Sequence, residues 1–211
     1  MLKYYEDQYF YYFVKPHNIP STYGKEYCFL DLLEDYSKKN KEINQIFGFL
    51  KEFWTKEEEY GLLNRLDNET MGLLYFAKNP LFKQKYLELQ EQNLILKYYL
   101  ADVYWEFYED ERTITYPIAH HAFDEKKMVA VKSATEKFRW KPNNVETQVK
   151  KIFYDTEKNI TTLLVTIHKW IRHQIRCHLS SIGYPIVGEK IYIKKKSSEN
   201  LCLWSLWLQT K

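Results

Sequence analysis

The sequence predicts an α+β fold, in which strands and helices share one domain without regular alternation. Segments with period-two alternation of apolar residues and segments with helical spacing both occur, and they do not form repeated strand–helix–strand units. A chain of 211 residues with 45% hydrophobic and 28% charged residues has the composition of a globular protein with a substantial core. Because no repeat, low-complexity tract or Gly/Ser/Pro-rich linker divides it, we expect a single domain over residues 1–211.

The first half of the chain predicts two strands and three helices. Aromatic residues dominate the range 9–14, and small or apolar residues fill the range 72–77, as expected of strands. Near-helical spacing of apolar residues predicts helices over 29–36 and 43–53. A polar segment that begins at a proline predicts an exposed helix over 80–92.

The second half predicts two further strands and one helix. Apolar residues alternate over 95–103, which places Lys97 and Tyr99 on the same face of a strand. Another strand is expected over 161–168. A helix is expected over 172–182, because a glycine follows it and a proline lies beyond.

The net charge of +3 is too small to identify a polyanionic partner, so the distribution of charge is more informative. Basic and acidic residues gather in separate groups along the chain. This distribution is compatible with a one-sided basic face, although each group alone is more often solvated surface. Aromatic residues make up 18% of the chain, so some rings could stack on bases while most pack in the core. Acidic residues gather at 57–59 and 106–111. The basic groups are Lys126, Lys127, Lys132, Lys137, Arg139 and Lys141; Lys169, Arg172 and Arg176; and Lys194, Lys195 and Lys196.

Cysteine and histidine spacing argues against disulfides and metal sites. The three cysteines, Cys28, Cys177 and Cys202, contain no CxxC pair, and no HExxH pattern occurs. The N-terminus lacks the apolar core of a signal peptide, and no uncharged apolar run is long enough to span a membrane. We therefore expect a cytoplasmic protein with no metal and no membrane partner.

A carboxylate at a loop-to-strand junction is the first candidate for chemistry. The segment 64–74 joins a charged loop to an apolar strand, and Asp67 lies where the chain turns. Loops held by a rigid strand often carry catalytic groups. From the residues alone, Asp67 could equally cap a turn or pair with Arg65.

Three short segments carry the strongest pattern in the sequence. They are Arg65, Leu66 and Asp67 with Thr70, Gly72, Leu73, Leu74, Ala77, Lys78 and Asn79; Lys97, Tyr99, Ala101 and Val103; and His173, Gln174, Ile175, Arg176, His178 and Leu179. In the same order, they resemble the motifs of RluA-type pseudouridine synthases. One match would be weak, whereas three in order are strong.

The resemblance implies an enzyme that isomerises uridine to pseudouridine in RNA without a cofactor or metal. It implies a mainly antiparallel central sheet flanked by helices, with the active-site cleft across the sheet. Asp67 would be the catalytic carboxylate, Tyr99 would lie against the uracil and assist proton transfer, and Arg176 would keep Asp67 ionised. Arg65 would contact the displaced RNA backbone or fill the vacated stack. Further candidates for RNA contact are Lys97, Thr70, His173 and Gln174.

Several positions depart from the family pattern. Asn64 and Met71 replace a histidine and a serine, and Glu189 stands in place of an aspartate. The segment Lys169–Arg172 replaces Thr-Gly-Arg-Thr. The replacement of aspartate by Glu189 is conservative. The other departures put the identity of the substrate in doubt more than the chemistry, and they motivate a second hypothesis, a noncatalytic RNA-binding or RNA-folding module.

Other interpretations stay open at the level of single residues. Without the motifs, Tyr99 is a half-buried strand tyrosine and Arg176 an exposed helix arginine bonded to an acid. A third hypothesis is an unrelated hydrolase that uses Asp67 and Arg65. The leading expectation is a monomeric catalytic domain that acts on ribosomal or transfer RNA, with no separate N-terminal RNA-binding domain.

Overall fold

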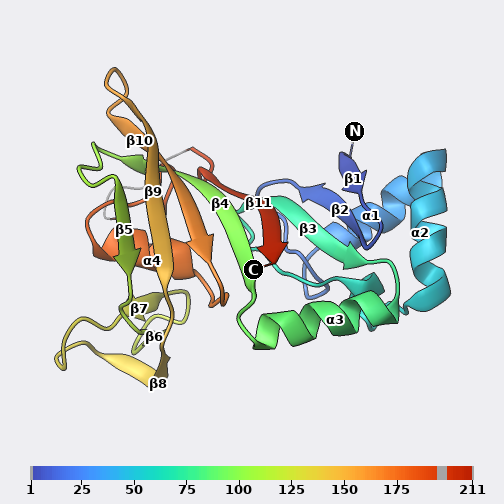
Figure 1. Cartoon of the computed structure of the whole chain (residues 1–211), viewed down its shortest axis with the longest axis horizontal. Helices are drawn as coiled ribbons and strands as arrows, with labels where there is room; N and C mark the ends of the chain where they lie inside the picture. Colours follow the sequence, from blue (N-terminus) through green and yellow to red (C-terminus); the bar gives the residue numbers. More distant parts are fainter. Residues whose placement is uncertain (1, 194–198, 211) are drawn as a thin grey trace. The chain divides into compact units, whose positions relative to one another are not determined.

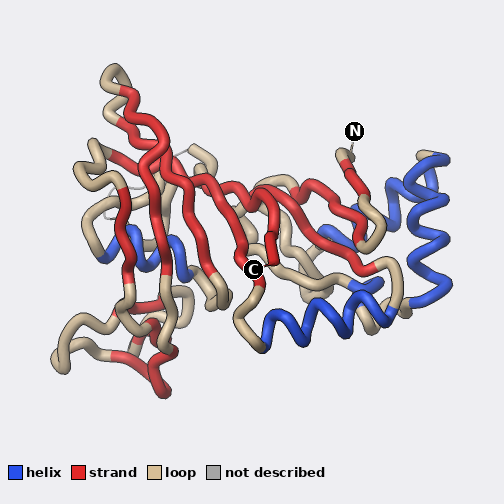
Figure 2. Tube along the Cα trace, viewed as in Figure 1, coloured by secondary structure: helices blue, strands red, loops and turns tan. Residues whose placement is uncertain are grey.

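The computed structural model describes residues 2–193 and 199–210 (Figures 1 and 2). The chain separates into two compact units, Met1–Gln92 and Asn93–Lys211, which we call unit 1 and unit 2. Strands and helices mix in each unit, and the described strand pairs are antiparallel. The predicted α+β class is therefore confirmed, whereas the single domain stays a prediction.

Unit 1 combines an antiparallel sheet with helices. Its strands lie in the order β1-β2-β3, and Phe13 of β2 is paired with Leu74 of β3. Asn40 and Asn79 cap α2 and α3, since their side-chain oxygens accept hydrogen bonds from backbone N–H groups three residues on. The elements are β1 (Tyr4–Glu6), β2 (Phe10–Lys15), α1 (Phe29–Lys39), α2 (Lys41–Phe53), the 3₁₀ helix η1 (Glu59–Gly61), β3 (Met71–Ala77) and α3 (Pro80–Glu91).

The core of unit 1 explains why α1 and α2 fold onto this sheet. Both helices have one apolar face, and their buried residues include Leu33 and Leu50. The ring of Phe13 contacts those of Phe29 and Phe76, with centroid distances of 6.4 and 5.5 Å. Aromatic packing therefore joins helix α1 to strands β2 and β3, and β3 directly follows the Asp67 loop.

The described residues of unit 2 form two sheets and one helix. The larger sheet has the order β11-β4-β10-β9-β5, and the smaller one has the order β7-β6-β8. Figure 1 shows the smaller sheet beyond the ends of β5 and β9. The elements are β4 (Ile95–Tyr104), β5 (Glu111–Ile114), β6 (Ile118–His121), β7 (Met128–Ala130), β8 (Phe138–Asn143), β9 (Thr147–Asp155), β10 (Ile160–Ile167), α4 (Gln174–Ser181) and β11 (Leu203–Thr210).

Strand β4 confirms the alternation on which the sequence analysis depended. Its burial alternates strictly along its length, so that Lys97 and Tyr99 lie on the buried face. The other predicted strands and helices also form, with ends shifted by up to three residues.

Several regions differ from the predictions or were not covered by them, and β1, η1 and β11 are among those for which no element was predicted. Helix α4 begins at Gln174 rather than 172, because His173 adopts a left-handed conformation with φ of 54°. No element was predicted between β4 and β10, where the structure has five strands from β5 to β9. The basic run Lys194–Lys196 lies outside the described residues.

Candidate active site

In unit 1, Asp67 lies at the start of a tight turn that leads into β3. The backbone N–H of Thr70 donates to the carbonyl of Asp67 at 3.0 Å, which closes the turn. Thr70 and Leu66 are buried on either side, whereas Asp67 is half-buried. The turn therefore fixes the backbone of Asp67 while leaving its carboxylate partly accessible.

Residues 15–21, which are the end of β2 and the loop after it, hold this turn in place through hydrogen bonds. The hydroxyl of Ser21 donates to the carbonyl of Leu66 at 3.0 Å and accepts from its N–H at 2.9 Å. Nδ1 of His17 lies 2.8 Å from the carbonyl oxygen of Glu69. The ammonium of Lys15 donates to the carbonyl of Asn68 at 3.0 Å. The turn is thus held at three points by residues about fifty positions earlier in the chain.

Lys15 is a fully buried cation close to Asp67. Besides Asn68, its ammonium donates to the carbonyls of Pro16 and Ile19, at 3.0 and 2.8 Å. Burial lowers the pKa of Lys15 to about 8, against the opposing attraction of the Asp67 and Glu69 carboxylates. The sequence analysis missed this residue. The available signal was a lysine on the same strand face as the apolar Tyr11 and Phe13.

We expect Lys15→Met to destabilise the protein by about 2–4 kcal/mol, because buried carbonyl oxygens lose their shared donor. The activity should also fall, since the Asp67 turn loses one of its attachments. Urea unfolding at pH 7 measures the first effect. The matched control is Lys25→Met, which replaces an exposed lysine of the same unit and should change stability by well under 1 kcal/mol. Equal stabilities of the two variants would contradict the bracing role of Lys15.

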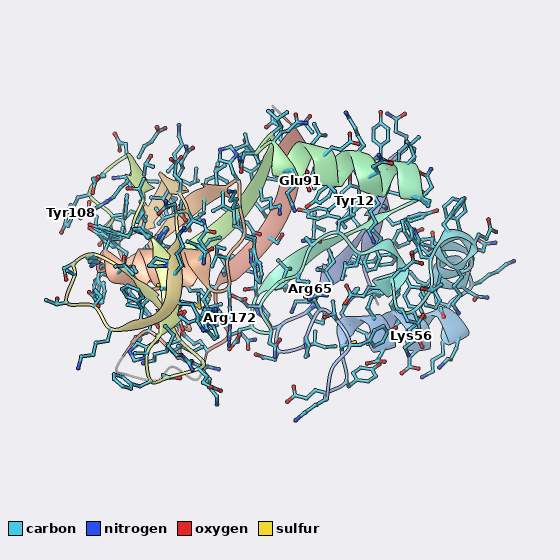
Figure 3. All side chains as sticks on the ribbon, turned by 90° about the horizontal axis from the view of Figure 1, so that it is seen from below. Tyr12, Lys56, Arg65, Glu91, Tyr108 and Arg172 are labelled. Atoms are coloured by element: carbon cyan, nitrogen blue, oxygen red, sulfur yellow. The ribbon has the colours of Figure 1, made fainter. Side chains whose placement is uncertain are left out.

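The two residues before Leu66 have distinct surroundings. The side chain of Asn64 donates to the carbonyl of Leu73 at 3.1 Å and accepts from the N–H of Tyr75 at 2.8 Å, so it supports the edge of β3. Arg65 is 60% exposed, and its guanidinium pairs with Glu59 at 2.8 Å (Figure 3). Arg65 therefore offers an accessible cation next to the turn.

In unit 2, the predicted site residues lie on β4 and on α4 with the segment that precedes it. Tyr99 and Lys97 are both buried on the same face of β4. Burial lowers the pKa of Lys97 to about 8. A lysine with this pKa is mostly protonated at neutral pH, so it can attract phosphate, and it gives up its proton more readily than an exposed lysine.

Arg176 on α4 forms a buried ion pair with Glu189. Its Nε and Nη2 atoms each donate to one oxygen of the carboxylate at 2.8 Å, while the two side chains are 1% and 0% exposed. Glu189 also accepts from the N–H groups of Lys190 and Ile191 at 2.9 and 2.8 Å. This bidentate pair fixes the plane of the guanidinium and leaves Nη1 as the group outside the paired edge.

The pKa of Glu189 shows that its contacts stabilise the ionised carboxylate more than burial destabilises it. Burial alone would raise it, but the hydrogen bonds and charge of Arg176 and the two backbone N–H groups outweigh burial, so the pKa is lowered. Glu189 is therefore ionised at neutral pH. The sequence analysis treated Glu189 only as a conservative replacement and did not identify it as the partner of Arg176.

His173 and Gln174 at the start of α4 make structural contacts. Nδ1 of His173 lies 3.0 Å from the hydroxyl of Tyr192, which itself accepts from the N–H of Met128 at 3.0 Å. The amide of Gln174 accepts from the N–H of Ile171 and donates to the carbonyl of Glu146 and the hydroxyl of Thr147. Both side chains are buried. They position α4, and their contact with RNA stays a prediction, as it does for the buried Thr70.

The described residues show neither a metal-binding cluster nor a membrane-spanning helix. Within residues 2–193 and 199–210, no group of three or more His, Cys, Asp or Glu side chains is placed to hold a metal ion. Over the same ranges, no helix combines the length and apolar character needed to cross a membrane. The cytoplasmic location stays a prediction.

The fold resembles solved pseudouridylate synthases. A human protein described as RNA Pseudouridylate Synthase Domain Containing 1 aligns over 99% of this chain and 78% of its own, with a TM-score of 0.71 and 18% identity. Human RNA Pseudouridylate Synthase Domain Containing 4 aligns over 97% and 82%, with a TM-score of 0.66 and 20% identity. At these identities the likeness concerns the fold.

Sequence comparison gives the family. Residues 9–181 match the model of the RNA pseudouridylate synthase family, and the chain belongs to that family. It is 34% identical over 141 residues to an uncharacterized RNA pseudouridine synthase of Aquifex aeolicus, covering 67% of this chain and 42% of that protein. It is 30% identical over 132 residues to the ribosomal large subunit pseudouridine synthase D of Nitrosomonas europaea, covering 63% and 35%. The resemblance to RluA-type synthases is thus confirmed. The matched regions are 42% and 35% of the lengths of these two relatives.

Proposed function

We propose that this chain isomerises specific uridines to pseudouridine in structured RNA, ribosomal or transfer, and that Asp67 is the catalytic carboxylate. Membership of the family supports the activity. The observation that carries the role of Asp67 is its position in the family's Arg-Leu-Asp motif, on a turn braced by Lys15, His17 and Ser21. A rigid backbone with a partly accessible carboxylate suits a group that must meet a substrate atom at a fixed place.

The reaction replaces one bond between the ribose and the uracil of a nucleotide by another. The bond between C1′ of the ribose and N1 of uracil breaks, the base turns, and a bond forms between C1′ and C5. The hydrogen on C5 is lost to solvent and N1 gains a proton, so the product has the same composition as the substrate. No oxidant, reductant or cofactor is needed, and the uracil must stay bound throughout.

Asp67 acts at C1′ in this scheme. As an anion it attacks the sugar or stabilises the positive charge that develops when the C–N bond breaks. A partly buried carboxylate needs a nearby cation to remain ionised. Lys15 supplies positive charge beneath the turn, and Arg176 is the residue that the family motif assigns to the carboxylate itself.

In this proposal, residues of unit 2 bind the uracil and supply the positive charge and the proton-transfer groups. Tyr99 provides a flat surface for the uracil and a hydroxyl for proton transfer at C5. Glu189 positions Arg176, because it takes the Nε and Nη2 edge and so directs Nη1. Lys97, with its lowered pKa, contacts phosphate or assists the proton transfer.

Two of the departures from the family pattern, Asn64 and Glu189, do not favour the noncatalytic alternative. Asn64, which replaces the family's histidine, bonds to the backbone on β3 and so maintains the entry to the turn. Glu189, which replaces an aspartate, completes the bidentate pair with Arg176. The groups that carry chemistry in the proposal are all present.

We expect Arg65→Ala to slow pseudouridine formation on the order of 10²-fold, because the cation that positions the displaced RNA backbone is lost. Its stability should change by less than about 1 kcal/mol, since the pair with Glu59 is exposed. A single-turnover assay and urea unfolding measure the two effects. In the control, Glu59→Gln removes the same ion pair but keeps Arg65, and should react at nearly the normal rate. A rate for Arg65→Ala equal to that of the control would contradict the role in RNA positioning.

The activity is tested by mapping pseudouridine in total RNA from strains with and without this gene. Carbodiimide-dependent stops in primer extension locate each site. The proposal predicts at least one stop that disappears with the gene and returns with the normal protein but not with Asp67→Ala. Complete restoration of the stop by Asp67→Ala would count against it.

A further inference from the structure

Large aromatic side chains on the small sheet of unit 2 face solvent. Phe123 and Trp140 are 78% and 70% exposed, and Phe138 is partly exposed. These rings are not needed for packing, because the sheet has its own apolar core. That core consists of Ile118, Met128, Ala130, Val145 and Cys177.

Irregular backbone directs Trp140 outward. In the pairing of β8 with β6, Arg139 lies opposite His120 and Asn143 lies opposite Ile118, so residues 140–142 form a bulge. Trp140 itself has a φ of 60°, in the left-handed region that bulky residues rarely occupy. Bulges re-aim side chains, and such strained conformations cluster at binding sites.

A basic side chain lies near each of two exposed rings, Trp140 and Phe123. The guanidinium of Arg139 lies 5.5 Å from the centre of the Trp140 ring and donates through Nε to the carbonyl of His121 at 3.1 Å. The ring of His120 meets Trp140 edge-on at 4.7 Å. The ammonium of Lys137 lies 5.8 Å from the ring of Phe123. Trp140 and Phe123 therefore each have a positive group beside the ring.

The charge of this region is also distinctive. Residues 118–143 contain six lysines and arginines against three aspartates and glutamates, an excess that equals the net charge of +3 of the whole chain. Positive charge combined with exposed aromatic rings fits a nucleic acid, since phosphates need cations and unpaired bases stack on rings. A duplex fits less well, because the faces of its bases are covered by their neighbours.

We propose that Trp140, Arg139, His120, Phe123 and Lys137 form a second RNA-binding surface, in which an unpaired nucleotide flanking the modified site stacks on Trp140. The choice of RNA as the partner rests on the proposed function. The surface contributes affinity for the substrate and takes no part in the bond exchange at Asp67.

The test uses the full chain and fluorescence anisotropy with a single-stranded RNA of about 12 nucleotides and the same strand in a duplex. Trp140→Ala should weaken binding of the single strand about tenfold and leave binding of the duplex nearly unchanged. Trp140→Phe should retain most of the affinity. The matched control is Tyr108→Ala, because Tyr108 is 77% exposed but lies in the acidic segment 106–111. Figure 3 shows Tyr108 and Arg172 in different parts of unit 2.

A second measurement separates charge from stacking. Lys137→Gln should reduce the slope of log affinity against log salt by about 1, whereas Trp140→Ala should leave that slope unchanged. Because Trp140 is exposed, its removal should not alter the urea midpoint, so a loss of affinity will not reflect unfolding.

Two results would overturn the proposal. If Trp140→Ala binds the single strand as well as Tyr108→Ala does, RNA does not occupy this surface, and a protein partner becomes the occupant to test. If Trp140→Ala loses single strand and duplex equally, the ring does not stack on unpaired bases. Failure of the proposed function gives a different pattern, in which binding depends on Trp140 but the normal protein forms no pseudouridine.

Discussion

Replacing Asp67 by Asn should abolish the reaction while leaving the fold and RNA binding nearly intact. The substitution keeps the size of the side chain and removes the charge that acts at C1′, so the single-turnover rate should fall by at least about 10⁴-fold. Release of tritium from RNA labelled at C5 of uridine measures this rate, because the C5 hydrogen must leave. Anisotropy with the same RNA measures binding.

The control for Asp67→Asn lies next to it in the same turn. The side chain of Asn68 is exposed, and its contact with Lys15 uses only the backbone carbonyl. Asn68→Ala should therefore keep at least roughly a tenth of the normal rate. If Asp67→Asn released tritium as fast as Asn68→Ala, another group would have to be the nucleophile.

Replacing Glu189 by Ala should cause the largest loss of stability, about 3–5 kcal/mol, because it leaves the buried guanidinium of Arg176 without its bidentate partner. Urea unfolding at pH 7 measures the loss. The control is Glu111→Ala, which breaks an exposed pair with Lys150 and should cost less than about 1 kcal/mol. The double variant Arg176→Met with Glu189→Leu should regain much of the stability, since neither charge is then buried alone.

The pH dependence of this effect has a definite sign. The pKa of Glu189 is lowered in the folded protein from the ordinary value of 4.5. Its ionised form therefore contributes full stability above that value, and the contribution is lost as the pH falls through the lowered pKa. The difference in stability between the normal protein and Glu189→Ala should shrink in that acid range. A difference that instead grew as the pH fell below 4.5 would contradict the pairing.

The sequence predicted what local pattern determines. Period-two alternation placed Lys97 and Tyr99 on the buried face of β4, because side chains alternate between the faces of a strand. The proline at the first position of α3 marked the beginning of the helix for a similarly local reason. The three motifs identified the family, which the comparison with known proteins confirmed.

Contacts between distant segments could not be predicted in the same way. Lys15 reaches Asn68, 53 positions away, and this bond depends on how β2 is paired with β3. Glu189 meets Arg176 only because the segment after α4 folds back, and nothing in the spacing of 13 residues requires it. The bulge that exposes Trp140 likewise arises from the register of β8 on β6.

The central claim is that this chain converts uridine to pseudouridine with Asp67 as the catalytic carboxylate. Its most direct test is to identify the product formed by the pure protein. RNA from a strain that lacks the gene is incubated with the full chain and a metal chelator, digested to nucleosides and analysed by liquid chromatography and mass spectrometry. The account predicts a new nucleoside with the mass of uridine and the retention time of pseudouridine, formed by the normal protein and absent with Asp67→Asn. Uridine left unconverted by a normal protein that still binds the RNA would contradict it.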